Sequence, residues 1–303
     1  MEQIKFTKAF FIKLGAKGRY EPYSIPEGKA RIGFHNFTLE KINSCLWDEL
    51  MKMEGPNYDK KGVAARDVNM LRYFVESTSE DVWITFHNRH LYWCRLENTP
   101  LLEDSISRYR TVTDRWLSYN IKGQELIEDQ IPGNISKIQR FPAAICRVKE
   151  VDALERLING VPSEAYQGIS QAKDVLVHEI EKGLRLLHWK DFEILVDLLF
   201  RNAGWNRVSK VGETMKYVDI VLEEPISGER YLVQVKAEAT SEDFDKFLSQ
   251  IPKEGYNKLY FITHSPDGDF THNYDKVEVM LPEELAKKVV GLGLTDWLMK
   301  KIQ

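Results

Sequence analysis

The pattern of hydrophobic and polar positions is clearest in the last 116 residues of the chain. An amphipathic helix is predicted over 188–202, because its apolar residues recur at helical spacing up to Gly204. Two strands are then predicted, joined by the turn-like sequence EEPISGER, and a helix and two further strands follow. The chain closes with helices beginning at Pro282 and Thr295. Strands at 217–222, 231–237, 259–263 and 277–281 and a helix at 242–250 predict a mixed sheet flanked by helices, of the α/β or α+β class.

The first half has shorter alternating stretches separated by Gly and Pro, together with many aromatic residues. This pattern predicts a compact β-rich domain with a few helices. Helices are expected at 38–53 and 63–75. Strands are expected at 8–14, 30–34, 81–86, 90–96 and 143–148.

Between the halves, the sequence Gly160-Val161-Pro162-Ser163 ends one helix and caps a longer one that begins at Glu164. We therefore predict a helical connector. The expected organisation is a recognition domain over 1–151, the connector over 152–187 and a catalytic domain over 188–303.

Composition narrows the class of protein. The 303 residues carry 42 basic and 46 acidic side chains, a net charge of −4, and the length suits about two domains of roughly 150 residues. The first 150 residues carry 23 basic and 20 acidic side chains and the remainder 19 and 26, so the first half is mildly basic. Three cysteines without a CxxC pair do not form a disulfide or zinc framework. The charged N-terminus and the lack of a long apolar run favour a cytoplasmic protein with no membrane partner.

The predicted hairpin brings unusual polar groups together. A turn centred between Ile226 and Ser227 places Asp219 opposite Gln234 and Tyr217 opposite Lys236. Because side chains alternate along a strand, Asp219, Gln234 and Lys236 share one face. A carboxylate, an amide and an ammonium are unusual in a hydrophobic core. Together they suit a site that holds a divalent metal and a phosphate.

The chemistry of phosphodiester hydrolysis explains this set of residue types. A hard cation such as Mg²⁺ or Mn²⁺ prefers oxygen ligands, which Asp219, the Gln234 amide and the main-chain carbonyl of Val235 offer. Lys236 can orient or deprotonate water and neutralise developing phosphorane charge. A further carboxylate is expected nearby, and Glu193 on the preceding helix is the best candidate.

Structural alternatives exist for each of these residues. Asp219 and Lys236 can form a cross-strand ion pair. Asp197 and Arg201 follow Glu193 at helical spacing and fit a solvated stripe. His188 suits a helix cap better than a catalytic role, and Glu213 suits a solvated loop better than a metal site.

These residues carry a family resemblance. The sequences His188-Trp-Lys-Asp-Phe-Glu193, Asp219-Ile-Val and Gln234-Val-Lys236 resemble the Mrr-type branch of the PD-(D/E)xK restriction-endonuclease-like fold, over about residues 187–285. That branch has a helix Glu, a strand Asp, and QxK where most relatives have ExK. The resemblance implies that Glu193, Asp219, Gln234 and Lys236 are the active-site residues. One departure is the sequence Lys216-Tyr217-Val218, where the family often has Gly or Asp before its catalytic Asp.

The first half has a second, more diffuse resemblance. The stretches 11–20, 32–34, 81–86 and 91–93 resemble the PUA-like group, which includes EVE and YTH domains. Those are small β-barrels in which aromatic side chains cage a base, often a modified one flipped from a duplex. The resemblance suggests Tyr20, Tyr23, Trp83 and Trp93 as base-binding residues. Contacts to the nucleic-acid backbone are expected from Lys13, Lys17, Arg19, Arg108 and Arg110.

The sequence therefore predicts a modification-dependent, type IV-like restriction endonuclease that cuts double-stranded DNA with Mg²⁺ or Mn²⁺. Two alternatives stay open: a catalytically silent sensor of modified nucleic acid or a nucleotide, and a repair or junction-resolving nuclease. One active site per chain implies a homodimer or a higher assembly for cutting both strands.

Overall fold

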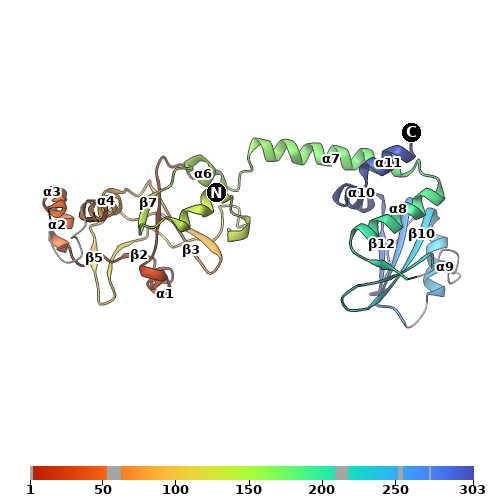
Figure 1. Cartoon of the computed structure of the whole chain (residues 1–303), viewed down its shortest axis with the longest axis horizontal. Helices are drawn as coiled ribbons and strands as arrows, with labels where there is room; N and C mark the ends of the chain where they lie inside the picture. The colour runs from red at the N-terminus through yellow and green to blue at the C-terminus, as the bar shows by residue number, and fades with distance from the viewer. Residues whose placement is uncertain (1–2, 53–62, 209–217, 252–254, 273) are drawn as a thin grey trace. The chain divides into compact units, whose positions relative to one another are not determined.

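The computed structural model describes residues 3–52, 63–208, 218–251, 255–272 and 274–303. Its contacts divide the chain into two compact units, Met1–Ser163 and Glu164–Gln303 (Figure 1). The division falls at the Pro162-Ser163 stop that the sequence indicated. Each unit has its own hydrophobic core.

The first unit is built on two separate sheets. A four-stranded sheet has the order β4-β3-β1-β7, with β1 parallel to β3 and antiparallel to β7, and a three-stranded sheet has the order β2-β6-β5. In the part of this unit that the structure describes, the strands do not close into a barrel, which is a correction to the expected β-barrel. The strands are β1 (Ala9–Ile12), β2 (Lys29–Ile32), β3 (Val82–His87), β4 (His90–Cys94), β5 (Leu102–Glu103), β6 (Arg108–Thr111) and β7 (Ile145–Arg147).

Short helices surround these sheets. The helix expected over 38–53 is wrong as a single element, because Cys45 takes a left-handed φ of 54° and separates α2 from α3. Residue 53 lies outside the described residues. The helices are α1 (Glu21–Ser24), α2 (Leu39–Asn43), α3 (Trp47–Met51), α4 (Val63–Glu76), α5 (Gly133–Ser136) and α6 (Val151–Ile158), with 3-10 turns η1 (Ala16–Gly18), η2 (Glu128–Gln130) and η3 (Lys137–Arg140).

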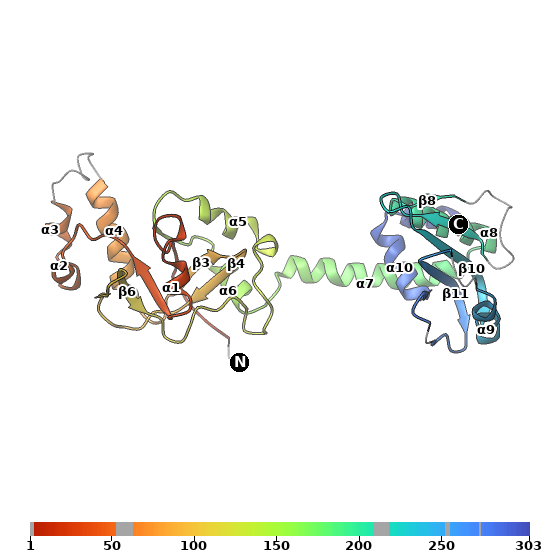
Figure 2. The same ribbon diagram turned by 90° about the horizontal axis from the view of Figure 1, so that it is seen from below.

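The second unit contains one five-stranded mixed sheet of order β12-β11-β10-β9-β8. β10 pairs antiparallel with β9 and parallel with β11, and Figure 2 shows β10 and β11 side by side. Ile220 pairs with Val233 and Leu222 with Tyr231, which is the register expected from a turn at Ile226 and Ser227. The strands are β8 (Asn206–Arg207), β9 (Ile220–Glu223), β10 (Arg230–Thr240), β11 (Lys258–Asp267) and β12 (Val277–Met280).

Helices cover both faces of this sheet. On one face α8 and α10 pack on a core that includes Val233, Val235 and Ile262, and on the other α9 packs Phe244 and Phe247 against Phe261. The expected mixed sheet flanked by helices is therefore confirmed. The helices are α7 (Glu164–Leu184), α8 (Trp189–Asn202), α9 (Ser241–Gln250), α10 (Pro282–Gly291) and α11 (Thr295–Lys301).

The stretch expected as a connector is shared between the units. Leu154 and Ile158 of α6 lie in a core of the first unit, whereas Val177, Ile180 and Leu184 of α7 lie in the main core of the second. Within the described ranges, no helix is long and apolar enough to cross a membrane.

Candidate nuclease site

Asp219 lies immediately before β9, where the ladder with β10 begins. Its backbone N–H donates to the carbonyl of Val233 at 2.9 Å, which fixes the residue beside β10. Its Oδ2 accepts hydrogen bonds from the Gln234 side-chain amide at 2.5 Å and from the Val235 N–H at 2.7 Å. The predicted neighbourhood of Asp219 and Gln234 is thus present. Tyr217, expected opposite Lys236, lies outside the described residues.

The surroundings of Asp219 disfavour the ionised form of its carboxyl group. Burial raises the pKa of the Asp219 carboxyl above its ordinary value, while the Val235 N–H, Lys236 and the Gln234 amide act in the opposite direction. Gln234 itself is only 5% exposed. The carboxylate is therefore held in a partly desolvated position, and its side-chain and backbone donors among the described residues both bond to Oδ2.

Glu193 reaches the same site from α8. The helix is anchored by its buried face, in which Phe192 packs edge-on against His264 at 4.4 Å between ring centroids. His188 caps the helix by accepting from the Lys190 N–H at 3.4 Å, as expected. Burial and then the negative charge of Asp219 raise the pKa of Glu193, so the two carboxylates are close enough to repel.

Lys236 is the exposed member of the set. It forms no hydrogen bond or ion pair with any residue that the structure describes. The alternative in which Asp219 and Lys236 form a cross-strand ion pair is thus not found. Its charge nevertheless lowers the pKa of both Asp219 and Glu193, which places the ammonium within electrostatic reach of both carboxylates.

Arg207 on β8 is a member of this site that the sequence did not reveal. Its guanidinium pairs with Asp197 of α8 at 3.3 Å, and its charge lowers the pKa of Glu193 and Asp219. Asp197 also pairs with Arg201 of the same helix at 2.9 Å. The residues expected to form a solvated stripe therefore also link α8 to β8, through the pair of Asp197 with Arg207. No motif singles out Arg207, because its position depends on how β8 joins the sheet edge.

The donor set fits a hard divalent cation. The carboxylates of Asp219 and Glu193, the Gln234 amide and the carbonyl of Val235 offer oxygen ligands in a partly buried position. Over the described ranges, no group of three His, Cys, Asp or Glu side chains is arranged to hold a metal. The site would thus depend on two carboxylates supplemented by neutral oxygens. Glu213, set aside above as a ligand, lies outside the described residues.

A sheet with two helix-bearing faces, and a strand pair that carries Asp219, Gln234 and Lys236 beside a helix glutamate, defines a restriction-endonuclease-type domain. Residues 184–274 match a family model, Mrr_cat, described as "Restriction endonuclease". This match includes all four predicted active-site residues and confirms the Mrr-type resemblance of the C-terminal part.

Comparisons with solved structures and with curated proteins add little to this family match. A solved structure of the restriction endonuclease FokI bound to DNA is similar at 13% identity with a TM-score of 0.25, over 67% of this chain. The chain spans only 39% of the length of that structure. None of the curated proteins compared with the chain matches it.

The aromatic residues expected to bind a base are mostly core residues, which is a correction. Tyr20 and Trp93 are 5% exposed and Trp83 is fully buried. Trp83 stacks on Phe10 at 4.8 Å and its indole N–H donates to Ser77. Buried rings present no face to a base; of the four, only Tyr23, at 47% exposure, is accessible.

Two of the cations expected on the DNA backbone are also buried. Arg108 donates to the carbonyls of Phe34 and Phe37, and Arg110 to those of Phe74, Ser77 and Glu97. Both guanidiniums therefore hold the first unit together, and the expectation that they bind DNA is wrong. Lys17 and Arg19 are exposed, and Lys13 donates to the Phe141 carbonyl.

Proposed function

We propose that the chain is a divalent-metal-dependent endodeoxyribonuclease whose active site consists of Glu193, Asp219, Gln234 and Lys236. The observation that carries the proposal is that Asp219, Gln234 and Lys236 lie together on one strand pair, beside Glu193 of α8, whose pKa the charge of Asp219 raises. Among the described residues, Lys236 has no hydrogen-bond or ion-pair partner. The match of residues 184–274 to a restriction-endonuclease model supports it.

Each residue has a role that follows from its position. Asp219, Glu193, the Gln234 amide and the Val235 carbonyl would hold Mg²⁺ or Mn²⁺, which polarises the phosphoryl group and lowers the pKa of water. Hydrogen bonds from Gln234 and Val235 fix the orientation of the Asp219 carboxylate. Lys236 has no competing partner among the described residues, so its ammonium is free to orient water and to balance the charge that develops on phosphate.

The proposal includes dependence on modified DNA. It is supported by the resemblance of the first half to base-reading PUA-like domains and by the mildly basic charge of that half. Lys13, Lys17 and Arg19 remain candidate backbone contacts, and Tyr23 the accessible ring among those expected. Cutting both strands would require two copies of the chain, because the described residues of one chain form one such site.

A direct test incubates the full chain with modified and unmodified duplex DNA in Mg²⁺, in Mn²⁺ and in EDTA. Cleavage of modified DNA that needs a divalent ion supports the whole proposal. Equal cleavage of both substrates would contradict the proposed dependence on modified DNA and would still support the proposed nuclease activity. Preference for branched DNA regardless of base chemistry favours a repair nuclease.

A second candidate is a catalytically silent sensor. The observation in its favour is that Gln234, a neutral residue, stands where a third carboxylate would strengthen metal capture. Calorimetry with Mn²⁺ discriminates between the two: absence of binding by the full chain, together with binding of DNA, supports the sensor.

A further inference from the structure

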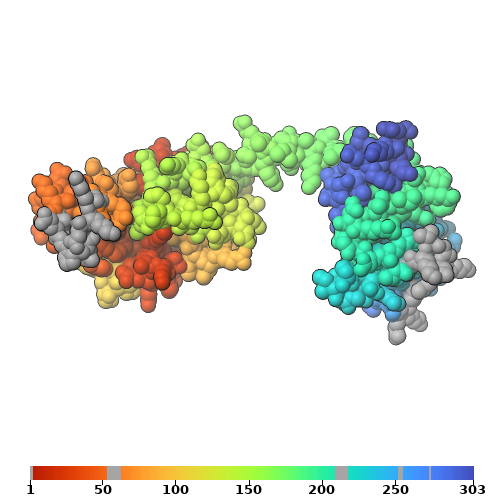
Figure 3. Space-filling view, in the orientation of Figure 1, coloured from red at the N-terminus to blue at the C-terminus, as the bar shows by residue number. Residues whose placement is uncertain are grey.

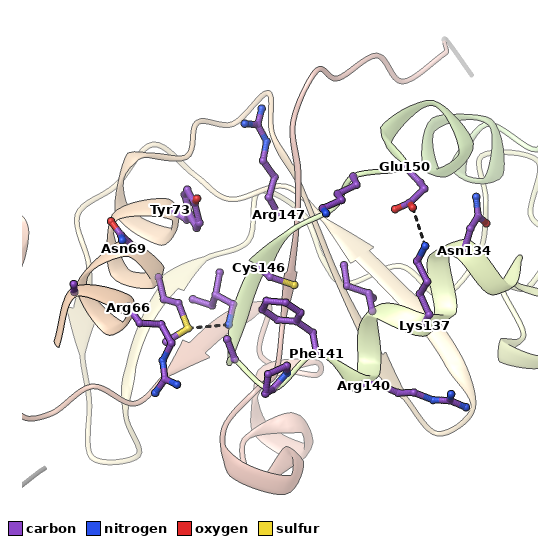
Figure 4. A pocket seen from close by; sticks show the side chains of 17 residues that line it. Arg66, Asn69, Tyr73, Asn134, Lys137, Arg140, Phe141, Cys146, Arg147 and Glu150 are labelled. Carbon is purple, nitrogen blue, oxygen red and sulfur yellow. Dashed lines mark hydrogen bonds and ion pairs between the residues drawn. The ribbon is translucent and has the colours of Figure 1, made fainter. Parts of the chain in front are cut away.

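One cavity of the first unit is lined by none of the residues expected to bind a base. It has a volume of about 1000 Å³ and lies between α4, η3 and β7 (Figure 4). Its floor is apolar and includes Met70, Ile138 and Ile145. Cavities of several hundred Å³ with an apolar lining and a few polar groups are typical of small-molecule and cofactor sites.

Two accessible aromatic rings belong to this cavity. Tyr73 comes from α4 and is 42% exposed, and Phe141 comes from the segment before β7 and is 47% exposed (Figure 4). Most other large rings of the first unit, such as Trp83 and Trp93, are buried. Exposed rings over an apolar floor offer stacking surfaces for a planar group.

The rim of the cavity is strongly cationic. Five basic side chains line it against a single carboxylate, that of Glu150, which Lys137 already pairs at 3.0 Å. The cations Arg140, Arg147 and Lys149 form no ion pair with any residue in the described ranges. Residues around 130–150, yellow-green in Figure 3, lie at the surface of the unit, so these charges are open to solvent. A rim of this sign favours an anionic ligand.

We propose that this cavity binds a nucleotide unit, with the base stacked against Tyr73 and Phe141 and the phosphate held at the cationic rim by Arg147. The combination of an aromatic-flanked apolar floor with a cationic rim matches a ligand that is planar and apolar at one end and anionic at the other. Asn69 and Asn134 line the same cavity and carry amide groups that can pair with a base edge. The nucleotide can come from a DNA strand or from a free nucleotide, since both present the same chemistry.

The proposal concerns binding and does not depend on whether the Asp219 site cleaves DNA. The test uses the full chain in EDTA, which prevents metal-dependent cleavage, and measures fluorescence anisotropy. The probes are a fluorescein-labelled ten-nucleotide single strand, the matching duplex, and unlabelled AMP and ATP as competitors. Competition by AMP or ATP assigns a free nucleotide, and binding of oligonucleotides without such competition assigns a DNA strand; either outcome supports the proposal.

Matched variants locate the binding. Phe141→Ala removes an exposed stacking ring, and its control Tyr274→Ala removes a ring of similar exposure in the second unit, outside the cavity. Arg147→Gln removes a rim charge, and its control Arg115→Gln removes an exposed charge of the same unit outside the cavity. We expect Phe141→Ala to weaken binding about 10-fold and Arg147→Gln about 3- to 10-fold, while the controls change it less than about 2-fold.

Two results would overturn the proposal. One is that none of the oligonucleotides or nucleotides binds the full chain. The other is that Tyr274→Ala and Arg115→Gln weaken binding as much as the cavity variants do, since binding would then not be located in this cavity. Circular dichroism and thermal unfolding of each variant show that it is folded, and Tyr73→Phe, which keeps the ring, should bind as the wild type does.

Discussion

The side-chain amide of Gln234 donates a hydrogen bond to the carboxylate of Asp219 across the β9–β10 pair. A glutamate at position 234 could not donate this bond when ionised and would place a third negative charge beside a carboxylate whose pKa burial already raises. Gln234 thus makes the metal-free site more stable and reduces the charge available to bind a cation.

The variant Gln234→Glu tests both effects of residue 234, on the stability of the metal-free protein and on its affinity for a cation. We expect the metal-free variant to lose about 1–3 kcal/mol of unfolding free energy, because a buried hydrogen bond is replaced by like-charge repulsion. We also expect affinity for Mn²⁺ to rise by on the order of 10-fold, because ligand charge increases. Thermal unfolding in EDTA and calorimetric titration with Mn²⁺ measure the two effects. Unchanged values for both would mean that residue 234 does not face the metal site.

The variant Asp219→Asn tests how much the buried charge of Asp219 lowers the stability of the metal-free protein, because this effect depends on pH. The pKa of Asp219 is raised from an ordinary value of 3.8, so the native state holds this proton more tightly than the unfolded chain does. The metal-free wild type therefore loses stability as pH rises from about 4 through the shifted pKa, and the neutral asparagine does not.

We accordingly expect the stability of Asp219→Asn relative to wild type to increase with pH across that window and then to level off. Denaturant unfolding in EDTA at a series of pH values measures this difference. Asp245→Asn, an exposed carboxylate on α9, serves as the control and should show little change. A difference that falls with rising pH would mean that the native site favours the charged carboxylate.

Arg110 should behave as a structural residue. Burial lowers the pKa of its guanidinium to about 10, and its N–H groups satisfy the carbonyls of Phe74, Ser77 and Glu97. We expect Arg110→Met to cost roughly 2–4 kcal/mol of unfolding free energy, because those carbonyls lose their partners. The measurement is denaturant unfolding, with exposed Arg115→Gln as the control. If Arg110→Met kept its full stability and bound DNA more weakly, Arg110 would be a DNA contact, as the sequence predicted, and not a structural residue.

The C-terminal unit could be predicted from the sequence in unusual detail. Local signals there agree with one another: an amphipathic helix ends at Asn202, two residues before Gly204, and a turn at Ile226 and Ser227 sets the register of the hairpin. Because side chains alternate along a strand, that register alone places Asp219 beside Gln234. Arg207 escaped notice because the two-residue strand β8 has no hydrophobic pattern.

The first unit was harder to predict because tertiary packing decides which of its aromatic and basic residues are buried. Trp83 and Arg110 belong to residue types that bind nucleic acid on a surface, yet one stacks within the core and the other bonds to buried carbonyls. Strand β6, with the sequence RYRT, has the alternation of a strand but buries its arginines. The accessible rings Tyr73 and Phe141 lie 68 positions apart in the sequence and line one cavity only in the folded chain.

The rate of DNA cleavage by active-site variants tests the nuclease proposal most directly. Wild type, Asp219→Ala, Lys236→Ala and the exposed α9 control Lys246→Ala are compared on the same modified duplex in Mg²⁺ or Mn²⁺. We expect cleavage by wild type and by Lys246→Ala at equal rates, and a loss on the order of 100-fold or more in the other two. Undiminished cleavage by Asp219→Ala and Lys236→Ala, or no cleavage of modified or unmodified DNA by the wild type, would contradict the assignment of this site.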